Sequence, residues 1–203
     1  MSSALLKRTS YPDYPSYLQH QGEKLTRSGG EAYVQPEVQV EHFRQRFAMI
    51  PDLPEGQSVL CLGARRGEEV RAWRMIGHQA MGVDVNPGAD NPDVVVGDFH
   101  DLPFEKHGFS VVYTNSLDHA YDLEKVCGQM RRMVSGTGWI VLDLVSGYAE
   151  GYHTGGRDCL HWPTAAWMAW QVAELLGWPV QRFLRYPDDL APYIWQVVYH
   201  DPR

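Results

Sequence analysis

The chain has 203 residues, of which 44% are hydrophobic and 21% are charged, an ordinary composition for a globular protein with one sizeable core. Lysine and arginine total 18 against 25 acidic residues, for a formal net charge of -7, so we do not expect the basic face that binds a nucleic-acid backbone. The three cysteines have spacings that match no metal framework, and the sequence shows neither an apolar signal core nor a long uncharged stretch. These features favour a cytoplasmic protein without a membrane segment.

The first 35 residues are polar and rich in turn-forming residues, and we expect an irregular segment with a short helix between Tyr17 and Leu25. This segment is interpreted either as a lid over a ligand or as a packed or disordered tail. Pro36 then opens a helical pattern that places apolar side chains on one face. These are Val38, Val40, Phe43, Phe47 and Ile50.

Short apolar runs alternate with helical patterns along the rest of the chain. Strands are expected at 58–62, 80–84, 94–96, 109–114 and 139–144, and helices at 68–76 and 123–134. A helix at 162–176 and two strands at 180–186 and 193–199 follow, and the tight turn between these strands makes them antiparallel. The pattern predicts an α/β, Rossmann-like doubly wound sheet of seven strands, mostly parallel with a C-terminal antiparallel hairpin.

Two loops after the first two strands have features of a nucleotide site. The first runs from a buried strand through Gly63 and Gly67 into a helix start, where glycine allows a sharp turn and a close approach of the backbone to a ligand. Asp84 ends the second strand, and a carboxylate there can accept both hydroxyls of a ribose. The alternatives are an ordinary tight turn at the first loop and a capping residue at the second.

Polar residues also follow the third and fourth strands. Asp98 can accept from an adenine amine and Phe99 offers an apolar face, although an Asx-turn would explain Asp98 as well. Thr114 and Asn115 follow the fourth strand, at the edge where doubly wound sheets bind ligands. His119 is a candidate general base, or a structural residue that caps the next helix.

Together these features resemble the class I S-adenosylmethionine (SAM)-dependent methyltransferases, and most closely their small-molecule, type-11-like subgroup. The resemblance covers roughly residues 56–146 and rests on the stretch from Gly97 to Phe104, the strand from Phe109 to Asn115, His119, and the helix that runs from Leu123 to the glycines before residue 139. It implies a methyltransferase domain over 36–203, SAM as cofactor and a small organic acceptor methylated at oxygen or nitrogen. It assigns to the cofactor Gly63, Ala64, Gly67, Asp84, Val85, Asp98, Phe99, Thr114 and Asn115.

The chain departs from that family at two positions. Cys61 stands where the family usually has an acidic residue, and Glu68 or Glu69 would have to replace it. Arg65 stands where a second glycine is usual, and its cation either pairs with the cofactor carboxylate or obstructs it. A non-catalytic SAM-binding protein of the same fold therefore stays an alternative. An NAD(P)-dependent oxidoreductase is a third hypothesis, against which stand the missing Gly-x-Gly-x-x-Gly pattern and the closing hairpin.

The acceptor site is expected to be formed by two segments, from which we single out four residues. Tyr17 and His20 lie in the N-terminal segment, and His153 and Trp162 lie in or beside a Gly-rich loop after the fifth strand. The residues His153, Asp158, Cys159 and His161 do not show the paired spacing of a zinc site, so no metal is expected. The sequence leaves the oligomeric state open.

Overall fold

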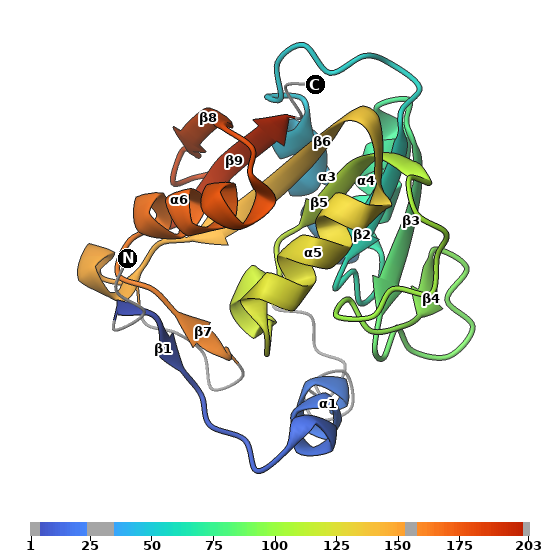
Figure 1. Ribbon diagram of the computed structural model, residues 1–203. Helices are drawn as coiled ribbons and strands as arrows, with labels where there is room; N and C mark the ends of the chain where they lie inside the picture. The colour runs from blue at the N-terminus through green and yellow to red at the C-terminus, as the bar shows by residue number, and fades with distance from the viewer. Residues whose placement is uncertain (1–4, 24–34, 153–157, 201–203) are drawn as a thin grey trace.

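A seven-stranded sheet forms the centre of the protein (Figure 1), in a computed structural model that describes residues 5–23, 35–152 and 158–200. The strand order is β4-β3-β2-β5-β6-β9-β8. The strands are β2 Ser58–Leu62, β3 Gln79–Asp84, β4 Val94–Val96, β5 Phe109–Thr114, β6 Val134–Val145, β8 Val180–Arg185 and β9 Ile194–His200. The first five in spatial order are parallel, and β9 is antiparallel to both of its neighbours. The expected sheet with its closing hairpin is confirmed.

Helices cover both faces of this sheet (Figure 1), as alternating strands and helices require. The helices are α3 Pro36–Phe47 and α4 Glu68–Met75 on one face, and α5 Leu123–Met133 and α6 Ala165–Leu176 on the other. Each pair buries its own apolar cluster against the sheet. One cluster stacks the rings of Phe47 and Trp73 with centroids 4.1 Å apart. In α3 the expected apolar face is formed by Val40, Phe43 and Phe47, whereas Val38 is 45% exposed.

Two elements of the main sheet and its helices begin three or more residues away from their predicted positions, for local reasons. Strand β6 begins at Val134, five residues earlier than expected, because the glycine-containing segment before Trp139 extends the strand instead of forming a loop. Its pairing with β5 shifts register between Phe109–Val134 and Val111–Trp139, which absorbs the extra residues as a bulge. Helix α6 begins at Ala165, since Thr164 caps it by accepting from the Trp167 amide, and Trp162 precedes it.

The described part of the N-terminal segment is more ordered than its composition predicted. Helix α1 spans Tyr14–Gly22, begins three residues earlier than expected and is capped by Asp13, whose side chain accepts from the Ser16 amide. A short strand β1, Lys7–Arg8, pairs antiparallel with β7, Leu160–His161. Figure 1 shows α1 and this small sheet beside the edge of the main sheet toward which the parallel strands point. In the described ranges, no helix is long and apolar enough to cross a membrane.

Candidate functional site

The loop after β2 depends on its two glycines. Gly63 has φ of +70°, and a Cβ there would lie 2.7 Å from the Cβ of Ser116. Gly67 has φ of +81° at the N-cap of α4, where a Cβ would lie 2.9 Å from that of Asp93. Both positions therefore need the conformational freedom and the small size of glycine. The turn brings the backbone and the first N–H groups of α4 to the edge of the sheet.

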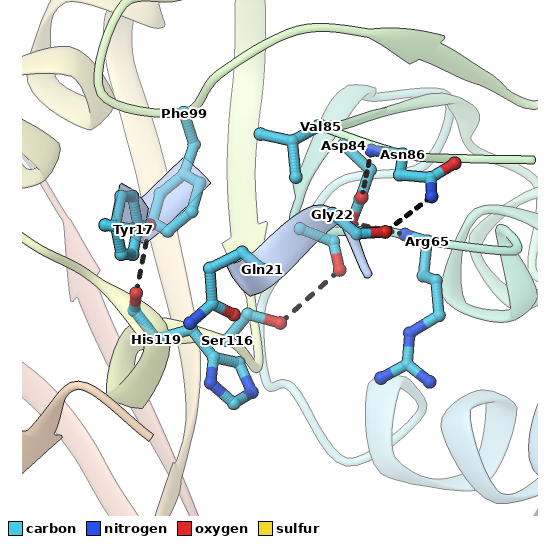
Figure 2. Close-up of a pocket in the computed structure, with 11 residues that line it drawn as sticks. Tyr17, Gln21, Gly22, Arg65, Asp84, Val85, Asn86, Phe99, Ser116 and His119 are labelled. Carbon is cyan, nitrogen blue, oxygen red and sulfur yellow. Dashed lines mark hydrogen bonds between the residues drawn. The ribbon is translucent and has the colours of Figure 1, made fainter. Parts of the chain in front are cut away.

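A pocket lies at this edge, between α1 and the loops that follow β2, β3, β4 and β5 (Figure 2). It contains about 500 Å³ of empty space, including the solvent at its mouth. Its walls are Tyr17, Gln21, Gly22, Gly63, Arg65, Asp84, Val85, Asn86, Phe99, Ser116 and His119. Six of the residues singled out from the sequence for a cofactor or base meet here, together with Tyr17. The pocket thus joins segments that lie far apart in the chain.

The Asp84 carboxylate lies in the wall of this pocket, and each of its oxygens accepts one hydrogen bond from a backbone amide. Oδ1 accepts from the Asn86 amide at 2.8 Å, and Oδ2 accepts from the Arg65 amide at 3.0 Å. Because a carboxylate oxygen has two lone pairs, each oxygen keeps an acceptor position for a ligand hydroxyl. Arg65 adopts φ of +38°, and Figure 2 shows its guanidinium directed away from Asp84. A positive φ is unfavourable for residues with a side chain and is adopted readily by glycine, which the related family usually has at this position.

Helix α1 is held to three of the loops that form the pocket. Tyr17 is 1% exposed, and its hydroxyl donates to the His119 carbonyl at 3.0 Å. The Asn86 side chain donates to the Gly22 carbonyl at 2.6 Å. The Tyr14 hydroxyl donates to Asp98 Oδ2. This helix therefore closes one side of the site, as a lid would.

Asp98, which the resemblance assigns to the cofactor, is not among the residues that line the pocket. Its Oδ1 accepts from the amide of His100 at 2.8 Å and lies 2.9 Å from Nδ1 of the same residue, while Oδ2 accepts from Tyr14. Burial raises the pKa of Asp98, but the hydrogen bonds from His100 and Tyr14 outweigh burial and hold the pKa below its usual value. Asp98 thus anchors α1 beside the pocket, and Phe99 alone of this pair lines it.

The residues at the end of β5 and directly after it have different roles, and the sequence did not indicate which of them line the pocket. Thr114 is 1% exposed, and its hydroxyl donates to the Leu62 carbonyl at 2.9 Å, so it joins two strands instead of lining the pocket. Ser116 lines the pocket, and its hydroxyl donates to the Gly63 carbonyl at 3.4 Å. Sequence reasoning missed Ser116, although its position two residues beyond a parallel strand was a usable signal.

His119 lines the pocket from a short 3-10 helix, Leu117–His119, with a carboxylate near each ring nitrogen. Nδ1 lies 3.6 Å from Asp158 Oδ1, and Nε2 lies 3.8 Å from Asp118 Oδ2. One ring nitrogen of His119 and one carboxylate oxygen each of Asp118 and Asp158 all lie within 4.8 Å of one another. The cap of α5 is Asp122, which accepts from the Lys125 amide at 3.0 Å, so His119 does not cap that helix.

The remaining predicted site residues lie elsewhere. Ala64 is buried in the apolar cluster beneath α4 and Gly67 caps that helix, so neither lines the pocket. His20 Nδ1 lies 2.8 Å from the Tyr11 hydroxyl, outside the pocket lining. Trp162 is 2% exposed and its ring nitrogen donates to the Val145 carbonyl, so it belongs to the core rather than to an acceptor site. His153 lies outside the described residues.

A second pocket lies on the other side of the segment after β5, and Asn115 lines it instead of the first pocket. Its lining includes a buried ion pair in which Arg46 Nη1 lies 3.0 Å from Asp143 Oδ2. Burial raises the pKa of Asp143, and the Arg46 charge and two tyrosine hydroxyls act against that rise. Its other walls are Gln39, His42, Leu190, Ala191, Pro192 and Ile194.

Residues 60–142 match a family of methyltransferase domains, type 11. No curated protein matches the chain significantly. Among solved structures, the chain is similar to 1,6-didemethyltoxoflavin-N1-methyltransferase of Burkholderia thailandensis, which binds its substrate and S-adenosylhomocysteine (SAH), with a TM-score of 0.71 and 12% identity over 98% of this chain and 95% of that one. The chain thus has the fold of the class I SAM-dependent methyltransferases.

Two further structures share the fold. One is a protein classed as a methyltransferase in complex with the Haloferax volcanii Trm112 methyltransferase activator, with a TM-score of 0.66 and 18% identity over 90% of this chain and 98% of that one. The other is a SAM-dependent methyltransferase of Thermotoga maritima, described as a possible histamine N-methyltransferase, with a TM-score of 0.66 and 13% identity over 89% and 98% of the two chains. The comparisons thus show a similarity of residues 60–142 to type 11 methyltransferase domains and a shared fold over most of the chain.

Proposed function

We propose that this protein binds SAM in the first pocket and transfers its methyl group to a small organic acceptor, at oxygen or nitrogen. The observation that carries the proposal is the Asp84 carboxylate, which lies in the pocket wall between a glycine loop and Phe99 and keeps acceptor capacity on both oxygens. In this arrangement Asp84 binds the ribose hydroxyls, Val85 and Phe99 contact the adenine, and the Gly63 backbone lies along the sulfonium end of the cofactor.

His119 is the candidate base for a hydroxyl acceptor. Its ring lines the pocket, and the Asp118 and Asp158 carboxylates beside its two nitrogens favour the imidazolium that forms when it accepts a proton. When bound, SAM would supply the electrophilic methyl group and its sulfur would keep the electron pair of the broken bond, while His119 would take the proton of the acceptor. An amine acceptor needs less of this help, because alignment and exclusion of water supply much of the rate.

The solved structures favour a small acceptor, since one of them methylates didemethyltoxoflavin. A protein partner is a second feature to test, since another was solved with a Trm112 activator. A non-catalytic SAM-binding protein of the same fold is the alternative function. It would bind the cofactor with full affinity and transfer no methyl group to any acceptor.

Calorimetric titration with SAM, SAH and NADH tests the cofactor. We expect micromolar binding of the two adenosyl ligands and none of NADH. Asp84→Ala should weaken SAH binding on the order of 100-fold or more, because two hydrogen bonds to a carboxylate are lost at about 1.5–3 kcal/mol each. Glu105→Ala, which removes an equal charge from an exposed loop position, is the control and should bind as the unmodified protein does. Equal affinity for the Asp84 variant would refute this site.

A further inference from the structure

The second pocket adjoins the first at the segment that follows β5. Asn115, directly after the strand, lines the second pocket, and the next residue, Ser116, lines the first. The Ser116 hydroxyl is shared between the Gly63 carbonyl and Asn115 Oδ1, which lies 3.1 Å away. One pair of neighbouring, hydrogen-bonded side chains therefore contributes to both pockets, and ligands in the two pockets would approach each other there.

The charged groups of the second pocket already compensate each other. Arg46 Nη1 lies 3.0 Å from Asp143 Oδ2, and both side chains are buried. Asp143 also accepts from the hydroxyls of Tyr113 and Tyr186, so its two oxygens receive three hydrogen bonds. Among the described residues, the lining holds no further Lys, Arg, Asp or Glu. A ligand with a net charge would enter this pocket without a counter-charge, which disfavours it.

The rest of the lining combines hydrogen-bond donors with an apolar wall. On Arg46, Nη1 donates to Asp143 and Nε to the His42 carbonyl, and Nη2 donates to no described residue. Asn115 uses Oδ1 to accept from Ser116, and its Nδ2 likewise donates to no residue in the described ranges. The apolar lining residues are Leu190, Ala191, Pro192 and Ile194. The pocket contains about 650 Å³ of empty space, including the solvent at its mouth, and so suits a small molecule with an apolar face and an uncharged hydrogen-bond acceptor.

A nitrogen nucleophile in such a pocket must present its lone pair without carrying a charge. An aliphatic amine such as the lysine side chain is protonated at neutral pH, and a protonated nitrogen has no lone pair to attack a methyl group. Aromatic amines and heteroaromatic nitrogens are far less basic, because their electrons are delocalised into the ring. His119 lines the first pocket and is not part of this lining, and a nitrogen acceptor needs less help from a base than a hydroxyl does.

We propose that the second pocket binds the methyl acceptor, and that this acceptor is an uncharged aromatic amine or heteroaromatic nitrogen compound with a carbonyl or similar hydrogen-bond acceptor. The inference rests on the proposed function and narrows its acceptor from oxygen or nitrogen to nitrogen. The nitrogen lone pair forms the bond to the methyl carbon, the electron pair of the broken bond stays on sulfur, and an N–H proton of the acceptor, where it has one, passes to water. Asn115 and Arg46 position the acceptor by donating to its carbonyl.

Three compounds of similar shape test the charge preference on the unmodified protein in the presence of SAH. At pH 7, 3-aminobenzamide is uncharged, 3-aminobenzoate is an anion and 3-aminobenzylamine is a cation. In NMR spectra of nitrogen-labelled protein, 3-aminobenzamide should shift the side-chain amide signals of Asn115 and Gln39, which both line the pocket. The two charged compounds should bind at least about 10-fold more weakly. With SAM in place of SAH, an interligand NOE between 3-aminobenzamide and the SAM methyl group should show that the two ligands adjoin.

A substitution that fills the pocket tests the place of binding. Leu190→Trp should weaken 3-aminobenzamide binding about 10-fold or more and leave SAH affinity within about 3-fold. Asp189→Trp, at the neighbouring exposed position outside the lining, is the control and should leave both affinities within about 3-fold.

Four results would overturn this inference and leave the proposed function intact, provided that SAM and SAH bind. They are no binding of 3-aminobenzamide, no preference for it over the charged compounds, no effect of Leu190→Trp, and no interligand NOE when both ligands are bound. If calorimetry shows that neither SAM nor SAH binds, the proposed function fails, and this inference fails with it.

Discussion

Arg46 and Asp143 form a buried ion pair in the lining of the second pocket, and removal of the arginine should destabilise the fold. Arg46 Nη1 lies 3.0 Å from Asp143 Oδ2, and the two side chains are 7% and 1% exposed. Asp143 also accepts from the hydroxyls of Tyr113 at 2.8 Å and Tyr186 at 2.9 Å. The substitution Arg46→Met therefore leaves a carboxylate that is hydrogen-bonded but buried without its counter-charge.

The expected loss is about 3–5 kcal/mol of unfolding free energy, the usual cost when one partner of a buried pair is removed. Methionine preserves much of the apolar stem of an arginine whose guanidinium lies 4.2 Å from the Phe43 ring, so the loss is mainly electrostatic. Urea unfolding at pH 7, followed by circular dichroism, measures it. Arg44→Met on the same helix is the control, because Arg44 pairs with Glu41 while both side chains are over a third exposed to screening solvent, and it should cost far less than Arg46→Met.

A double-mutant cycle with Asp143→Asn separates charge from packing. The asparagine keeps an acceptor for the tyrosine hydroxyls and removes the charge, so Arg46→Met should cost at least about 1 kcal/mol less in that background. If Arg46→Met costs as little as Arg44→Met, or costs the same with Asp143 and with Asn at this position, the reasoning is refuted.

Three further predictions concern residues in the first pocket or in the elements around it. In the folded protein burial raises the pKa of Glu69 to about 8, which is higher than its value in the unfolded chain, so its contribution to stability is present at low pH and is lost as the pH rises toward 8. The unfolding free energy should therefore fall by up to about 1.4 kcal/mol per pH unit relative to that of Glu69→Gln. Parallel pH profiles of the two proteins would contradict this. Arg65→Gly should stabilise the protein by about 1 kcal/mol in urea, since φ is +38°; destabilisation would mean that the arginine side chain matters more than its backbone. Tyr14→Phe removes the hydroxyl that donates to Asp98, so amide exchange should accelerate in α1 and not in the central strands; unchanged exchange in α1 would show that this hydrogen bond does not hold the helix.

The sheet was the most predictable part of the molecule. Strands at 58–62, 94–96 and 109–114 have the expected bounds, because short apolar runs between glycines, prolines and helical patterns have few other solutions. Asp84 and Gly63 were predictable for a related reason, since polar residues and glycines directly after parallel strands meet at one edge. Val134 was assigned to a helix because local pattern alone does not show that the following glycine segment pairs with β5 across a bulge.

The amino-acid sequence by itself determined the order of strands and helices, the closing hairpin and the glycine and acidic positions at the sheet edge, because periodicity and turn chemistry are local properties. Only the tertiary structure decided which polar residues are already engaged. It turned Asp98 toward Tyr14 and His100, buried Thr114, Trp162 and Glu69, and brought Asp158 beside His119. The reason is that hydrogen-bond satisfaction and burial depend on which distant segments pack together, and spacing along one chain does not contain that information.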